Sequence, residues 1–78
     1  MNKKNDFRAV VAAIKEKVKP GDIANICRKG NFSSQTFRKA MKAESWEALT
    51  AGELHAMENV ILFFEEREEL IKRAEAFL

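Results

Sequence analysis

The last third of the chain contains no residue that would interrupt a helix. After Gly52 there is neither glycine nor proline, and apolar residues recur at spacings of three and four, which is the period of one helix face. Thr50 and Glu53 match a capping box, in which a hydroxyl and a carboxylate three residues apart satisfy each other's free backbone amides. Together these features predict one helix over about 51–77. At 1.5 Å per residue it would be about 40 Å long, which exceeds the body of a small domain.

The first 50 residues predict three shorter helices, over about 5–18, 23–30 and 34–43. The Pro-Gly pair at 20–21 and the Gly-Asn pair at 30–31 separate them, because proline disfavours helix in the preceding residue and Gly and Asn tolerate the left-handed backbone that ends a helix. Asp22 and Ser33 are residue types that cap helix N-termini, so we expect them to begin the second and third helices. With one proline and three glycines, the chain has few turns for a β fold. The sequence therefore predicts an all-α fold.

Length and composition favour one soluble helical domain. The chain has 78 residues, of which 46% are hydrophobic and 33% charged. A single cysteine, Cys27, cannot form a disulfide framework within the chain and favours a reducing, cytoplasmic setting. The basic N-terminus lacks an apolar stretch of signal-peptide length, and no run of about 18 apolar residues could span a membrane.

No group of residues has the spacing of a catalytic or metal-binding site. The sequence lacks a nucleophile–base pair, a glycine-rich phosphate loop and a cluster of metal ligands. The carboxylates of residues 65–69 have no apolar surroundings that would raise a pKa for acid–base chemistry. Cys27 is interpreted as a small structural core residue, and His55 is expected to be exposed or half-buried and to have no functional role. We therefore expect no enzymatic activity, metal, cofactor or small-molecule ligand.

Charge is divided unevenly between the two parts of the chain. Residues 1–43 hold eleven Lys and Arg and three acidic residues, a net charge of +8, whereas residues 44–78 hold three and nine, a net charge of −6. The overall charge of +2 conceals this division. Such asymmetry indicates that one part faces a polyanion and the other faces solvent or protein.

The segment 21–42 resembles the helix-turn-helix of Cro/repressor-type (XRE-like) regulators, and in particular small phage and Bacteroidetes DNA-binding proteins. The resemblance covers about 22 of the 78 residues, and helix-turn-helix motifs are short. It rests on Gly21-Asp22, Ile26-Cys27, Phe32-Ser33, Thr36-Phe37-Arg38-Lys39 and Lys42. It implies that the helix 34–43 enters the major groove of DNA.

In that position the first turn of helix 34–43 would face the base edges. Gln35 would pair with adenine and Arg38 with guanine, and Ser34 would reach either base. The phosphate contacts would come from Ser33, Thr36, Lys39 and Lys42, with Lys19 and the N-terminus of the second helix helping from the other side. The alternative interpretation is an ordinary solvated helix face.

The long helix carries two apolar stripes. The first consists of Leu54, Met57, Ile61, Phe64, Ile71 and Leu78, and the second of Val60, Phe63, Leu70, Ala74 and Phe77. We expect the first stripe to cover the three short helices and the second to form a homodimer interface, because the helix is longer than they can cover. The alternative is that both stripes belong to the core.

The sequence thus favours a sequence-specific double-stranded DNA-binding protein, acting as a small transcription regulator and homodimer. The alternative is a helical protein-interaction module, such as an anti-repressor or antitoxin-like adaptor, which uses the long helix for a protein partner.

Overall fold

The computed structural model describes the backbone of residues 3–78 and the side chains from residue 6 onward. This part of the chain is all-α and contains no strand, as predicted. Its helices are α1 (Lys3–Lys17), α2 (Asp22–Gly30), α3 (Ser34–Lys42) and α4 (Ala51–Glu75), with a short 3-10 helix, η1, at Trp46–Ala48. Every α-helix begins and ends within two residues of its predicted bounds. None of the described helices is both long and apolar enough to cross a membrane.

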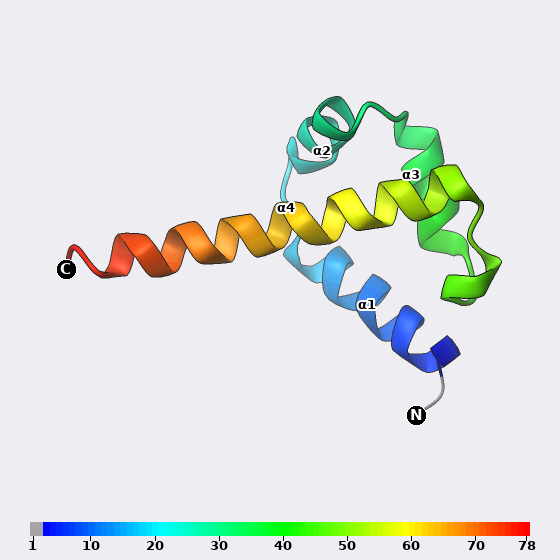
Figure 1. Ribbon diagram of the computed structural model, residues 1–78, viewed down its shortest axis with the longest axis horizontal. Coiled ribbons are helices and arrows are strands. Elements are labelled where there is room, and N and C mark those ends of the chain that lie inside the picture. The colour runs from blue at the N-terminus through cyan, green and yellow to red at the C-terminus, as the bar shows by residue number, and fades with distance from the viewer. Residues whose placement is uncertain (1–2) are drawn as a thin grey trace.

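The first half of α4 organises the core. It crosses the molecule with α2 and α3 on one side and α1 on the other (Figure 1). Phe7 of α1 is fully buried and meets Trp46 of η1 edge to face, with ring centroids 4.9 Å apart, a favoured aromatic geometry. The other buried apolar residues are Val11, Ile14, Ile26, Phe37, Ala40, Met41, Ala56, Met57, Val60 and Phe64. All four helices therefore share one core.

Two of the predicted helix caps are present. The Ser33 hydroxyl accepts a hydrogen bond from the Thr36 backbone N–H at 3.1 Å, and Thr50 forms the predicted capping box with Glu53. Asn31 ends α2 in the left-handed region, with φ of 58°. These local signals determine where α3 and α4 begin.

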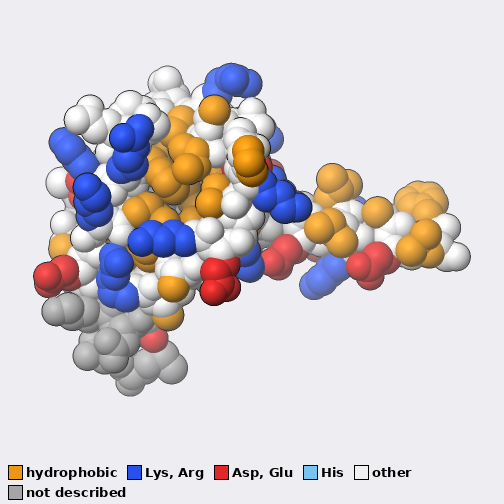
Figure 2. Space-filling model, turned by 180° about the vertical axis from the view of Figure 1, so that it is seen from behind, with side chains coloured by type: hydrophobic (Ala, Val, Ile, Leu, Met, Phe, Trp, Pro, Cys, Tyr) orange, Lys and Arg blue, Asp and Glu red, His pale blue; other side chains and the backbone are white. Residues whose placement is uncertain are grey.

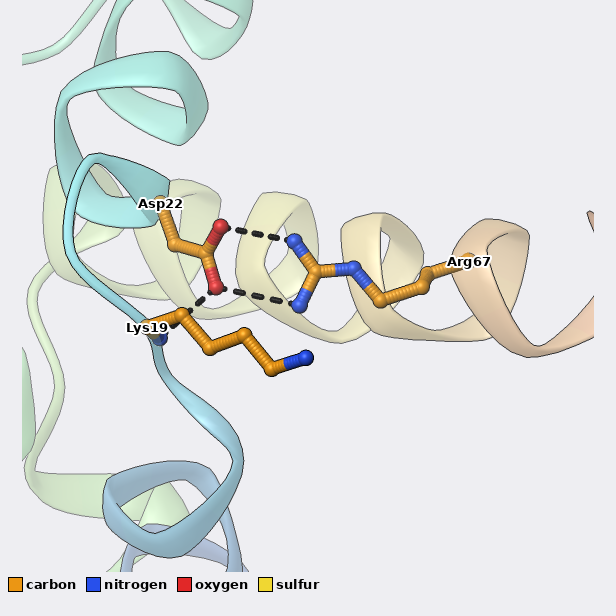
Figure 3. Close-up of polar contacts among 3 residues, drawn as sticks. All are labelled: Lys19, Asp22 and Arg67. Atoms are coloured by element: carbon orange, nitrogen blue, oxygen red, sulfur yellow. Dashed lines mark hydrogen bonds and ion pairs between the residues drawn. The ribbon is translucent and has the colours of Figure 1, made fainter. Parts of the chain in front are cut away.

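The predicted cap at Asp22 is wrong. Gly21 precedes α2 with a φ of 89°, and the Asp22 side chain caps no helix amide. Its carboxylate instead accepts hydrogen bonds from both terminal nitrogens of Arg67, at 2.6 and 3.0 Å, and from the Lys19 backbone N–H at 2.8 Å (Figure 3). Asp22 is buried, and its bonds to the Arg67 guanidinium lower the pKa of its carboxyl despite the opposing effect of burial. The start of α2 is thus tied to the middle of α4.

The predicted division of α4 into a core stripe and a dimer stripe is also wrong in part. Val60, assigned to the dimer interface, is fully buried in the core of its own chain, and Phe63 is half-buried against that core. Conversely, Leu54, Ile71 and Leu78, assigned to the core, are exposed. The position along α4 decides burial, because the short helices surround a wide sector of its first half and cover none of its end.

Residues 68–78 form an exposed extension, here called the arm. It projects away from the body (Figure 1), and all of its residues are exposed. At its base the Glu68 carboxylate accepts a hydrogen bond from the Lys17 ammonium at 3.0 Å. The arm therefore leaves the body directly after the contact between Arg67 and Asp22.

We expect alanine to destabilise the protein at Gly30 and to stabilise it at Gly52. A Cβ atom at Gly30 would overlap the Phe32 ring and lie 2.9 Å from the Asn59 Cγ atom, whereas Gly52 has no neighbour within 4 Å. Overpacking at Gly30 should cost about 1–3 kcal/mol, and Gly52→Ala should gain about 0.5–1 kcal/mol from helix propensity. Urea unfolding measures both. Equal stabilisation by the two variants would contradict the packing at Gly30.

The contact between Asp22 and Arg67 should make stability depend on pH. The folded-state pKa of Asp22 is lowered, so its contribution is complete above the unfolded pKa of about 3.9 and is lost as pH falls through the folded value. Asp22→Asn should lower the free energy of unfolding by about 1–3 kcal/mol at pH 7, and the gap from wild type should narrow below about pH 4.

The matched control is Glu69→Gln, which breaks an exposed ion pair with Arg73 on α4. It should change the free energy of unfolding by less than about 0.5 kcal/mol both at pH 7 and at pH 3. Urea midpoints measured from pH 7 to pH 3 make the comparison. A gap between wild type and Asp22→Asn that stays constant over this range would contradict the assigned ion pair.

Candidate nucleic-acid interface

One side of α3 is buried and the other is fully available to a partner. Phe37, Ala40 and Met41 face the core, which follows from their spacing of three and four residues. The opposite side is exposed and carries Ser34, Gln35, Arg38, Lys39 and Lys42. The structure thus brings together all three residues predicted to contact bases and two of those predicted to contact phosphates.

The two hydroxyls predicted to contact phosphates lie at the start of α3. Ser33 is exposed and Thr36 is half-exposed. Their hydroxyl oxygens lie 3.0 Å apart, within hydrogen-bonding distance, while Ser33 also caps the helix. Both remain at the N-terminal end of α3, where backbone N–H groups and the helix dipole favour an anion.

Lys19 lies elsewhere. It follows α1, and its side chain lines a shallow hollow together with Arg67 and Glu68 of α4. Figure 3 shows it beside the Arg67 side chain. Its backbone N–H is bonded to Asp22. The structure therefore does not bring Lys19 to the exposed side of α3 with the other predicted phosphate contacts.

The C-terminal end of α3 is held by a residue that the sequence did not single out. The Arg8 guanidinium of α1 donates hydrogen bonds to the backbone carbonyls of Met41, at 2.8 Å, and Ala43, at 3.0 Å. The last carbonyls of a helix lack partners within the helix, and a cation there also interacts favourably with the helix dipole. Arg8 therefore helps to fix the direction in which α3 presents its exposed side.

The turn between α2 and α3 is anchored to α4. His55 Nε2 lies 2.7 Å from the Gly30 carbonyl oxygen, and its ring meets the Phe32 ring edge to face at 5.9 Å. A carbonyl only accepts hydrogen bonds, so Nε2 carries the proton in this contact. The Asn59 amide donates to the His55 carbonyl at 2.8 Å. The turn is thereby packed against α4. His55 is exposed, within the expected range, but the sequence did not predict its contact with the turn.

The cations on α3 have no ion pair in the described part of the chain, as is also true of Lys15 on α1 and of Arg28 and Lys29 on α2. Among the described residues, Arg38, Lys39 and Lys42 form no ion pair, whereas Lys17 pairs with Glu68 and Arg67 pairs with Asp22. Figure 2 shows Lys and Arg side chains gathered on the body and acidic side chains along the arm. The basic charge of the first part of the chain is therefore left unneutralised on α3.

Cys27 has the environment of a packing residue. It is half-buried against the core, and burial raises the pKa of its thiol, which disfavours the reactive thiolate. The described residues include no group of three or more His, Cys, Asp or Glu side chains that could hold a metal ion.

Comparison with family models, curated proteins and solved structures finds no match to this chain.

Proposed function

We propose that the protein binds double-stranded DNA with sequence preference and acts as a small transcription regulator. The observation that carries the proposal is the exposed side of α3, where Arg38, Lys39 and Lys42 have no ionic partner in the described structure. An α-helix fits the major groove, which is about 12 Å wide. Unpaired cations on such a helix would replace the counterions of DNA phosphates. A cytoplasmic location would suit this role and keep the single cysteine reduced.

The proposed roles follow from the position of each side chain on α3. Arg38 and Gln35 are assigned to guanine and adenine, because their planar groups offer the matching pairs of donors and acceptors. Ser34, in the first turn, is assigned to the neighbouring base. Lys39 and Lys42 are assigned to phosphates, together with the hydroxyls of Ser33 and Thr36. Arg8 and the Ser33 cap hold the two ends of α3, so little ordering of the helix would be needed on binding.

Binding to short DNA duplexes at several salt concentrations tests the proposal. The logarithm of the binding constant should fall linearly with that of the salt concentration, by about 0.9 per phosphate contacted. Lys39→Ala and Lys42→Ala should weaken binding to all sequences and reduce the slope by about one each. Arg38→Ala should cost about 1–3 kcal/mol on a preferred sequence and reduce the preference.

Lys17→Ala is the matched control, because it also removes one positive charge but faces Glu68 of α4. It should leave the affinity and the salt slope nearly unchanged. A loss with Lys17→Ala as large as that with Lys39→Ala would contradict a binding surface on α3 and indicate only a general effect of net charge.

The arm supports a second proposal, that the chain pairs with another protein surface. Leu70, Ile71, Phe77 and Leu78 are between 51% and 105% exposed, and burying one such side chain is worth about 1.5–3 kcal/mol. We propose a second copy of this chain as the partner, with Leu70, Ala74 and Phe77 in the contact as predicted, joined by Ile71 and Leu78. Val60 is excluded from this contact by its burial.

In the alternative function the arm would bind a different protein. Charge reversal at Arg38 and Lys39 would then leave any binding to DNA unaffected.

A further inference from the structure

An apolar groove lies beside the proposed DNA-binding side of α3. It is formed by α1, α2 and α3 and encloses about 240 Å³. Ile14, Phe37 and Met41 contribute to its apolar floor, and Lys15, Arg38 and Lys42 lie along its rim. Figure 2 shows the apolar side chains in the middle of the body with Lys and Arg side chains around them. The groove therefore suits a ligand that is apolar on one side and acidic along an edge.

The arm has these two properties. Leu70, Ile71 and Ala74 lie within about 100° of the helix circumference, at 100° per residue, and Phe77 and Leu78 follow just after the end of α4 at Glu75. They continue the side of α4 that covers the core, but nothing in the described structure covers them. Glu68 and Glu75 border one edge of this apolar side, and Arg73, which pairs with Glu69, borders the other. The arm thus presents an apolar stripe with carboxylates along one edge.

We propose that the arm of one copy docks in the groove of a second copy. The arm cannot reach the groove of its own chain, because α4 continues straight away from the body (Figure 1) and has no Gly or Pro after Gly52 at which to turn back. The groove is smaller than the roughly 300–1,000 Å³ typical of small-molecule sites, whereas a few apolar side chains would fill it. The inference rests on the proposed pairing through the arm and identifies the surface that receives it.

Docking of the arm would compete with DNA. Arg38 and Lys42 belong both to the rim of the groove and to the proposed DNA contacts. A bound arm would cover them with its apolar stripe and place the Glu75 carboxylate where phosphates would otherwise lie, and like charges repel. Self-association and DNA binding are therefore mutually exclusive, and the paired form is inhibited.

Cysteine cross-linking between two differently tagged populations tests the inference. Both carry Cys27→Ser, one adds Ala74→Cys in the centre of the arm stripe, and the other adds Lys15→Cys on the rim of the groove. A short bis-maleimide should join the two populations, and excess duplex DNA should suppress the product. Cross-linking of the Ala74→Cys population only to itself would show arm-to-arm pairing and overturn the inference. A product that DNA leaves unchanged would overturn the competition.

Two charge reversals separate this inference from the proposed DNA binding. Lys15→Glu alters the rim of the groove and should weaken self-association by about tenfold or more, while DNA binding is largely kept. Lys39→Glu makes the same change on α3 outside the groove lining. It should weaken DNA binding and leave self-association largely unchanged. Light scattering measures the self-association of each variant, and DNA titration measures its affinity for DNA. A wild-type protein that stays monomeric at high micromolar concentration would overturn the docking and the pairing but leave the proposed DNA binding standing.

Discussion

The difference in length between α4 and the helices that it packs against determines the shape of this protein. At about 1.5 Å per residue, the 25 residues of α4 span about 37 Å, whereas the nine residues of α2 or α3 span about 14 Å. Only the part of α4 up to Arg67 is therefore covered, and there Met57 and Val60 are fully buried. The contacts of Arg67 with Asp22 and of Glu68 with Lys17 mark the last points at which α4 meets the body. Beyond them the arm is exposed.

The packing of α4 against the body also determines which cations are paired with carboxylates. Lys17 and Arg67 are neutralised by carboxylates at the point where α4 leaves the body, and the Lys29 and Arg67 side chains also lie over the Phe63 ring, at 5.8 and 4.7 Å from its centroid. No acidic residue of the described chain is paired with Arg38 or Lys42. The exposed side of α3 thus keeps its positive charge, and the proposed binding of DNA and docking of the arm both rest on it.

How far the sequence predicts this structure depends on the distance between the interacting residues. Ser33 and Thr50 cap amides three residues away, so their roles follow from local sequence. Asp22 was misassigned because its partner Arg67 lies 45 positions further on, and the role of Arg8 depends on carbonyls 33 and 35 positions away. The exposed side of α3 follows from helical period alone. The burial of Val60 does not, because it depends on which helices lie beside that turn of α4.

Selection of bound duplexes from a random pool of double-stranded DNA tests the central claim, that α3 reads DNA, most directly. At moderate salt the wild-type protein should enrich a preferred sequence that includes guanine, the base assigned to Arg38. The Arg38→Ala variant should bind without preference at that position. Recovery of no preferred sequence by the wild-type protein, or of the same sequence by both proteins, would contradict the account.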